Sequence, residues 1–200
     1  MHLSFHWHAI HRDLKYLKKT QDYVLCYSGC PSILEGYSDE SWITDKEDYA
    51  STSGCTYLLG GGAVSWASKK QTCITDSTTV AEFVALAAAS KEAEWLRNLL
   101  LEVPSWPKPI SPLSILCDSK TTLSKVYSHV YNGKSRHIGL RHAYVHQLIK
   151  DGVITVNYVQ TNENLADPLT KGLARDLVLR TSRGMGLKPI STITSKEAST

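Results

Sequence analysis

The sequence predicts a mixed α/β fold, with a five-stranded sheet that has an antiparallel hairpin edge, parallel strands beside it, and flanking helices. Two observations lead to this fold. Short apolar runs on both sides of a triple-glycine turn are typical of a β-hairpin. Further along the chain, short strand-like runs alternate with helical patterns, which favours parallel strands joined by helical crossovers. A length of 200 residues suits one domain with extensions.

The N-terminal half of the chain begins with a basic amphipathic segment and continues into strands. Residues 6–20 place apolar side chains on one stripe and predict a helix. Residues 45–53 are polar and acidic and predict a turn. Runs rich in apolar residues predict four strands, at 23–27, 33–44, 55–59 and 63–67. We therefore expect a small N-terminal unit followed by a strand-rich section, with the loop at 28–32 as the boundary.

The C-terminal half alternates between helical and extended patterns. Residues 77–101 predict the longest helix, which ends before Pro104. The wholly apolar run 113–117 predicts a buried central strand. The remaining predicted elements are helices at 119–126 and 138–150, a strand at 153–159 and a short final helix at 164–173. Residues 191–200 are small and polar and predict a disordered tail.

Composition excludes several classes of protein. No run of about 18 apolar residues occurs, so no membrane span is expected. The N-terminus has no apolar stretch followed by a small-residue cleavage site, as a secretory signal would have. The five cysteines are odd in number and form no C-x-x-C pair, which predicts reduced thiols in a reducing compartment.

The charge is unevenly distributed although the net charge is only +3. The window 119–150 contains no acidic residue, whereas 35–48 is strongly acidic. The basic window predicts a surface that binds nucleic acid, through Lys120, Lys125, Lys134, Arg136 and Arg141. A solvated basic helix without a partner is the simpler alternative.

Four acidic residues are the candidate catalytic and metal-binding groups: Asp39, Glu82, Asp118 and Asp167. Carboxylates that a fold brings together repel each other unless a cation lies between them. A pair of divalent cations is a common solution, and sites with two metals cleave phosphodiesters. Asp118 follows a buried strand, and ligands collect at the carboxyl ends of strands in α/β sheets. Glu82 shares a helix face with Ala85 and Leu86, and this face is expected to pack on the sheet. A carboxylate at the edge of a buried face is costly unless it is paired or bound to a cation.

Each acid also has a local alternative. Asp39 could be a surface acid near the hairpin, with Glu40 as a close competitor that points to the other face of the strand. Glu82 could form a capping box with Thr79. Asp118 could cap the helix that follows it, and Asp167 could cap a helix that begins at Pro168.

Several longer strings resemble the ribonuclease H region of copia-type retrotransposon Pol polyproteins. In order, they are YSDESW, STSGCTYLLGGGAVSWASKKQT, STTVAEFVALAAASKEAEWLRNLL, ILCDSKT, NGKSRHIGLRHAYVHQLI and VQTNENLADPLTKGL. The strings lie between residues 37 and 173, and the resemblance covers roughly residues 35–187. The N-terminal string HWHAIHRDLKYLKKTQDYVLCYSG resembles the end of the reverse transcriptase region. The resemblance implies a reverse transcriptase remnant at 1–30, a ribonuclease H domain at 31–190 and a tail at 191–200.

The resemblance implies a ribonuclease H-like fold and hydrolysis of the RNA strand of RNA–DNA hybrids, giving 5′-phosphate products. It implies two Mg²⁺ ions, with Mn²⁺ as a substitute. Asp39 and Asp118 would contact both ions, Glu82 would hold one ion and orient the attacking water, and Asp167 would complete the other site. The implied partners are the hybrid and the reverse transcriptase portion of the same polyprotein, with no membrane, in an intracellular, cytoplasmic virus-like particle.

The chain departs from the resemblance at two points, and other functions stay open. Copia-type sequences often have a second glutamate two residues before the catalytic one, whereas this chain has Val80, a change we expect to be harmless because Glu82 is retained. Many ribonucleases H have a histidine before the last acid that helps product release, whereas residues 160–164 contain none. Turnover is therefore expected to be slow unless Glu163 assists. The chain could also be an inactive or domesticated relic that binds hybrids without cleaving them. A further alternative is a structural segment that supports the polymerase.

Overall fold

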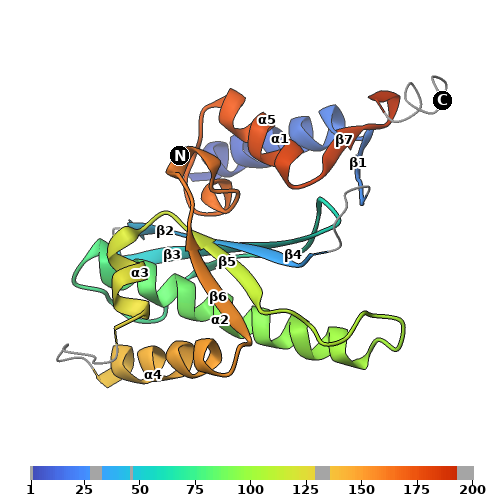
Figure 1. Ribbon diagram of the computed structural model, residues 1–200. Helices are drawn as coiled ribbons and strands as arrows, with labels where there is room; N and C mark the ends of the chain where they lie inside the picture. Colours follow the sequence, from blue (N-terminus) through green and yellow to red (C-terminus); the bar gives the residue numbers. More distant parts are fainter. Residues whose placement is uncertain (1, 28–32, 46, 129–135, 193–200) are drawn as a thin grey trace.

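The main sheet has five strands, in agreement with the predicted mixed α/β fold (Figure 1). The computed structural model describes residues 2–27, 33–45, 47–128 and 136–192. The strands are β2 (Glu35–Asp45), β3 (Ala50–Leu59), β4 (Gly62–Lys70), β5 (Leu113–Cys117) and β6 (Ile154–Tyr158). Their order in space is β4-β3-β2-β5-β6. The first three pair antiparallel, while β2, β5 and β6 pair parallel.

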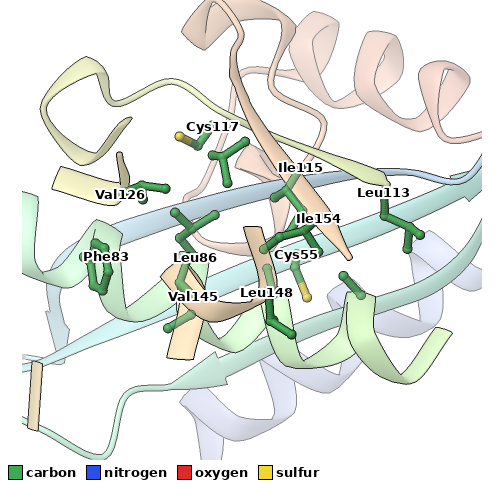
Figure 2. Packing of buried hydrophobic residues seen from close by; sticks show 14 of the residues in the cluster. Cys55, Phe83, Leu86, Leu113, Ile115, Cys117, Val126, Val145, Leu148 and Ile154 are labelled. Carbon is green, nitrogen blue, oxygen red and sulfur yellow. The ribbon is translucent and has the colours of Figure 1, made fainter. Parts of the chain in front are cut away.

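The hydrophobic core lies between this sheet and the helices on one of its faces (Figures 1 and 2). These helices are α2 (Thr78–Glu102), α3 (Lys120–Val126) and α4 (Arg136–Lys150). Figure 2 shows Phe83 and Leu86 of α2 near Val145 of α4, with Ile115 of β5 beside them. Each such large apolar side chain contributes about 1.5–3 kcal/mol when fully buried. This packing holds α2 firmly against the sheet.

One buried hydrogen bond shows which face of the sheet α2 covers. Tyr57 of β3 is fully buried and donates its hydroxyl to the carbonyl oxygen of Ala89 at 2.6 Å. Gly36 of β2 lies opposite Tyr57, so the alternate residues Gly36, Ser38 and Glu40 face α2. Asp39 therefore points to the opposite face, away from α2.

The predicted strand boundaries needed one correction. The polar segment 45–53 was expected to be a turn, but β3 already begins at Ala50. Thr52 and Ser53 pair with Ser41 and Glu40 of β2. Pairing with the neighbouring strand outweighs the polar composition of this segment, since strand propensity depends strongly on tertiary context.

The final helix was predicted in the wrong place. Residues 164–173 contain only the single turn η2 (Asp167–Leu169), which follows η1 (Thr161–Glu163), and the longer helix α5 (Arg175–Gly184) comes later. Asn164 explains the difference. Its side chain donates to the carbonyl of Ser38 at 3.0 Å and accepts from the amide of Ala166 at 3.1 Å. A side chain that takes over backbone partners in this way competes with a helix.

The two ends of the chain meet in a second, two-stranded sheet that the sequence did not predict. Strand β1 (Tyr23–Leu25) pairs antiparallel with β7 (Leu187–Pro189), beside α5 and the basic helix α1 (His2–Lys19) (Figure 1). The domain boundary predicted at residues 30 and 31 stays a prediction. Most of the predicted tail, and Lys134, lie outside the described residues.

The described part of the chain contains no helix with the length and apolar character needed to cross a membrane. The four described cysteines, Cys26, Cys55, Cys73 and Cys117, are free thiols.

Candidate metal-ion site

Two of the predicted acids are brought together by neighbouring parallel strands. Asp39 lies in β2 and is completely buried. Asp118 directly follows the last residue of β5. The parallel register pairs Tyr37 with Leu116, so Asp39 and Asp118 stand opposite each other two residues further along. Asp118 does not cap the following helix, because the N-cap of α3 is Ser119, whose side chain accepts from the amide of Thr122.

Glu82 approaches from α2, on the other side of β2. The capping-box alternative for Glu82 is wrong, because α2 begins earlier than that motif requires. Its N-cap is Ser77, whose hydroxyl accepts from the amide of Val80, and Thr79 already lies inside the helix. The neighbouring residues Ala81 and Phe83 are buried in the core, and Glu82 itself is half-buried. Its position is therefore set by packing of α2, and its carboxylate is free for another role.

Asp167 is brought to the site by η2, which packs on the face of the sheet opposite α2. The turn has Ala166 as its N-cap and no capping side chain, so the predicted capping role of Asp167 is wrong. Gly54 of β3, which pairs with Asp39, makes this packing possible. A Cβ atom at Gly54 would lie 2.7 Å from Cγ2 of Thr170 and 3.0 Å from Cβ of Leu169. The absent side chain lets η2 lie directly against β3, next to Asp39.

Three of the four predicted acids form a compact cluster. Asp39, Asp118 and Asp167 each offer a carboxylate oxygen, and these oxygens lie within 4.8 Å of one another. Lys171 lies beside them, with its Nζ 3.2 Å from Oδ1 of Asp39 and 3.1 Å from Oδ1 of Asp167. Thr170 donates a hydrogen bond to Oδ2 of Asp39. Glu82 is not a member of this trio.

Electrostatics nevertheless link Glu82 to the cluster. Burial, followed by the negative charges of Asp39, Asp118 and Glu40, raises the pKa of Glu82 to about 9. Burial also raises the pKa of Asp39 to about 6, although the hydrogen bond from Thr170 and the charge of Lys171 oppose this. Burial lowers the pKa of Lys171, but the charges of Asp39 and Asp167 outweigh that effect and raise it above the ordinary value. If all these acids were ionised, they would carry more negative charge than Lys171 alone can compensate.

The residues present fit divalent cations. Mg²⁺ and Mn²⁺ prefer oxygen ligands, and carboxylates are their usual protein ligands. Oε2 of Glu82 and Oδ1 of Asp118 are buried and have no hydrogen-bond partner. A buried carboxylate oxygen without a partner is costly, and a bound cation would remove that cost. Asp39, Asp118 and Asp167 therefore form a suitable ligand set, and Glu82 as a fourth ligand stays a prediction.

Sequence reasoning missed three residues that shape this site: Gly54, Thr170 and Lys171. The glycine carried a usable signal, since glycine inside a strand often marks the close approach of another segment. Thr170 and Lys171 follow Asp167 closely in the sequence. Their contacts with Asp39 could not be foreseen, because they depend on the turn η2, which the sequence did not predict. Glu40 was correctly expected to point away from Asp39, but the sequence did not reveal that Glu82 lies on that side.

The predicted nucleic-acid-binding residues that the structure describes lie on two helices, α3 and α4. Lys120 begins α3, two residues after Asp118, and its Nζ lies 4.9 Å from the centre of the Tyr158 ring. Lys125 and Arg136 are exposed. Arg141 of α4 lines a hollow of about 510 Å³ together with Lys69, Lys70 and Lys91. Contact of these basic positions with nucleic acid stays a prediction.

Solved structures with the same architecture define the class of this chain. The structure of LC11-RNase H1, isolated from compost, matches with a TM-score of 0.50 and 16% identity, over 70% of this chain and 94% of that one. The same protein in complex with an RNA/DNA hybrid matches with a TM-score of 0.50 and 15% identity, over 68% of this chain and 93% of that one. The fold is therefore ribonuclease H-like.

Sequence relatives narrow the class to a family. The chain is 34% identical over 171 residues to the retrovirus-related Pol polyprotein from transposon TNT 1-94 of Nicotiana tabacum, which covers 86% of the chain and 13% of that polyprotein. It is also 34% identical over 183 residues to the Pol polyprotein from transposon RE2 of Arabidopsis thaliana, covering 91% of the chain and 12% of that protein. The chain belongs to the copia-type retrotransposon Pol family and spans about an eighth of the length of these relatives.

A shorter match and one negative result complete the comparisons. Secreted RxLR effector protein 161 of Plasmopara viticola is 47% identical over 92 residues, which covers 46% of the chain and 65% of that protein. No family model matches the chain.

Proposed function

We propose that this chain is a metal-dependent endonuclease that hydrolyses the RNA strand of RNA–DNA hybrids. One observation carries the proposal: carboxylates from β2, the end of β5 and η2 converge within 4.8 Å in a ribonuclease H-like fold. Glu82 adds a buried carboxylate oxygen without a partner. The relatives and the solved hybrid complex agree with this function, which at its coarsest is a nuclease role within a retrotransposon Pol protein.

Asp39, Glu82, Asp118 and Asp167 would hold two divalent cations, with Mg²⁺ as the expected ion and Mn²⁺ as a substitute. Bound divalent cations lower the pKa of water and stabilise negative charge on a phosphodiester, including that of the leaving oxygen. The 5′-phosphate product is part of this proposal.

The protein's own contribution is to fix these ligands before substrate binds. Thr170 holds Asp39 by a hydrogen bond, and the packing of α2 and η2 fixes Glu82 and Asp167. Such preorganisation avoids reorganisation during the reaction. Lys171 partly neutralises Asp39 and Asp167.

Hybrid binding would involve the basic residues outside the acid cluster. Lys120, Lys125, Arg136 and Arg141 would contact phosphates, which supplies affinity without reading sequence. Recognition of the hybrid would depend on its shape and on RNA 2′-hydroxyls. We further propose that residues 31–190 are the nuclease domain and that 1–30 belong to the end of a reverse transcriptase region, which would be the partner within an intracellular particle.

Cleavage of a labelled RNA–DNA hybrid tests the proposal. Wild-type protein with Mg²⁺ should cleave the RNA strand, and EDTA should stop the reaction. Asp118→Asn, which keeps the size of the side chain, should lose cleavage by at least about 100-fold because a ligand at the site of charge development is removed. Asp151→Asn is the matched control, since Asp151 is exposed in the turn before β6 and should cleave like wild type.

Two outcomes would contradict the nuclease proposal. Equal cleavage by Asp118→Asn and wild type would exclude the acid cluster as the active site. Salt-sensitive hybrid binding without cleavage under either Mg²⁺ or Mn²⁺ would favour the domesticated relic instead.

A further inference from the structure

Glu40 is a buried carboxylate that the four-acid site does not use. Only 7% of the residue is exposed, and its Oε2 atom has no hydrogen-bond partner. An ionised side chain is almost never this buried unless it is paired. Either a structural need or a bound ligand must therefore account for Glu40.

The register of the sheet places Glu40 on the same side as Glu82. Glu40 pairs with Ser53 of β3, and residues paired across strands point to the same face. The hydroxyl of Ser53 accepts a hydrogen bond from Gln71, whose side-chain amide also donates to the carbonyl of Ala81 in α2. Glu40 thus faces the first turns of α2, where Glu82 follows Ala81.

The charges around Glu40 come from every element that meets at the acid cluster. The negative charges of Asp39 in β2 and Asp118 after β5 act on Glu40 along with the positive charge of Lys171 after η2. In turn, the charge of Glu40 acts on Glu82 in α2. Glu40 is therefore within electrostatic reach of four groups of the candidate metal site, and three of them repel it.

We propose that Glu40 is a fifth carboxylate of the divalent-cation site, which with Glu82 and Asp118 holds a cation from the α2 side of β2, directly or through a bound water. The inference deepens the proposed function and depends on its metal site. Glu40 stands next to Asp39 in the chain, but the two side chains leave β2 on opposite faces. The strand thereby supplies carboxylates to both sides of the site.

A count of formal charges supports this arrangement. Asp39, Glu40, Glu82, Asp118 and Asp167 carry five negative charges when ionised, and Lys171 carries one positive charge, which leaves −4. Two divalent cations would balance this charge fully. Without Glu40 the same two cations would leave an uncompensated positive charge at the site. Carboxylates that a fold brings together, such as Asp39, Asp118 and Asp167 here, repel each other unless cations lie between them.

Glu40→Gln separates a cation-binding role from a structural one, because glutamine keeps the size of the side chain but loses the charge. Mn²⁺ is titrated by calorimetry into metal-free protein, for wild type, Glu40→Gln, Asp118→Asn and Glu102→Gln. Glu102 ends α2 and is exposed, so Glu102→Gln is the matched control with the same charge change. Thermal unfolding with EDTA and with Mn²⁺ is recorded in parallel.

We expect Glu40→Gln to bind Mn²⁺ about tenfold more weakly than wild type, since groups that support metal ligands typically contribute 10–100-fold in affinity. Its unfolding midpoint in EDTA should equal or exceed that of wild type, because one repelled charge is gone, and Mn²⁺ should raise the midpoint less. Glu102→Gln should match wild type in both measurements. Asp118→Asn sets the size of the loss for a direct ligand.

Three results have distinct meanings. Equal Mn²⁺ affinity for Glu40→Gln and wild type would overturn the role of Glu40 while leaving the four-acid site intact. A Glu40→Gln protein that is unfolded in EDTA would also overturn it, since the carboxylate would then support the fold without any cation. Wild-type protein that binds no Mn²⁺ would refute the metal site of the proposed function itself.

Discussion

Gly54→Ala should disturb the candidate site through packing alone, without removing any ligand. Gly54 lies opposite Asp39 in the sheet, and its Cα faces the turn that carries Asp167. The added Cβ would lie 2.7 Å from Cγ2 of Thr170, 3.0 Å from Cβ of Leu169 and 3.2 Å from the carbonyl oxygen of Ala166. All three contacts belong to the segment that positions Asp167.

The magnitude follows from these distances. Carbon atoms normally pack about 3.5–4.0 Å apart, so Thr170 would have to retreat by about 1 Å. Overpacking of this kind typically costs about 1–3 kcal/mol. A displacement of about 1 Å at a catalytic centre can lower the rate by about 100-fold. We therefore expect Gly54→Ala to fold with reduced stability and to cleave hybrids up to about 100-fold more slowly.

Urea unfolding and hybrid cleavage, measured on the same preparations, test this reasoning. Gly172→Ala is the matched control. It lies next to Lys171 in the chain, but a Cβ atom there would meet no atom within 4 Å. The control should retain both stability and activity. Wild-type stability and cleavage in Gly54→Ala would refute the claim that the close approach of η2 to β3 positions the site.

Two further predictions concern the charges of the site. Burial raises the pKa of Glu82 from 4.5 to about 9 and that of Asp39 from 3.8 to about 6. The folded protein therefore binds protons at these acids more tightly than the unfolded chain does. In EDTA, the stability that this difference contributes should be complete below about pH 4 and should be lost progressively as the pH rises towards 9. Thermal unfolding midpoints in EDTA should fall from pH 5.5 to 8.5, and Mg²⁺ should reduce the fall; a midpoint that rises with pH in EDTA would contradict this. Lys171→Met should lower the midpoint at pH 8 in EDTA, because Asp39 and Asp167 lose their shared cation, and the loss should shrink in saturating Mg²⁺. Lys150→Met, at the exposed end of α4, is the control, and an equal effect of both substitutions would count against a specific role for Lys171.

Local pattern was sufficient for much of the fold. The hairpin around the glycine turn, the long helix α2 and the apolar strand β5 were all recognisable, because each has a strong period or a clear boundary in the chain. The elements of the C-terminal region could not be recognised in this way. The bond from Asn164 to Ser38 joins residues 126 positions apart, and no local propensity encodes it. The pairing of β1 with β7 connects the two ends of the chain and is equally invisible to local reasoning.

Some features of the acids in the candidate site could likewise be predicted from the sequence, and others could not. Asp118 could be placed in advance, since a residue after a buried parallel strand lies at the ligand-binding edge of such a sheet. The helical pattern around Glu82 also predicted its face correctly, although the capping role considered for it did not survive the actual start of α2 at Thr78. The local alternatives for Asp118 and Asp167 failed for the same reason: neighbouring residues, Ser119 and Ala166, take the N-cap positions.

By itself, the sequence determined the types and order of the elements from α1 to β6 and supplied the candidate acids, because these depend on residue chemistry and on short-range periodicity. Only the tertiary structure decided that Lys171 pairs with Asp39 and Asp167, that Gly54 makes room for η2, and that Glu40 shares a face with Glu82. The physical reason is that these relations depend on strand register and on contacts between distant segments, and a shift of one residue in register would turn every side chain of β2 to the opposite face.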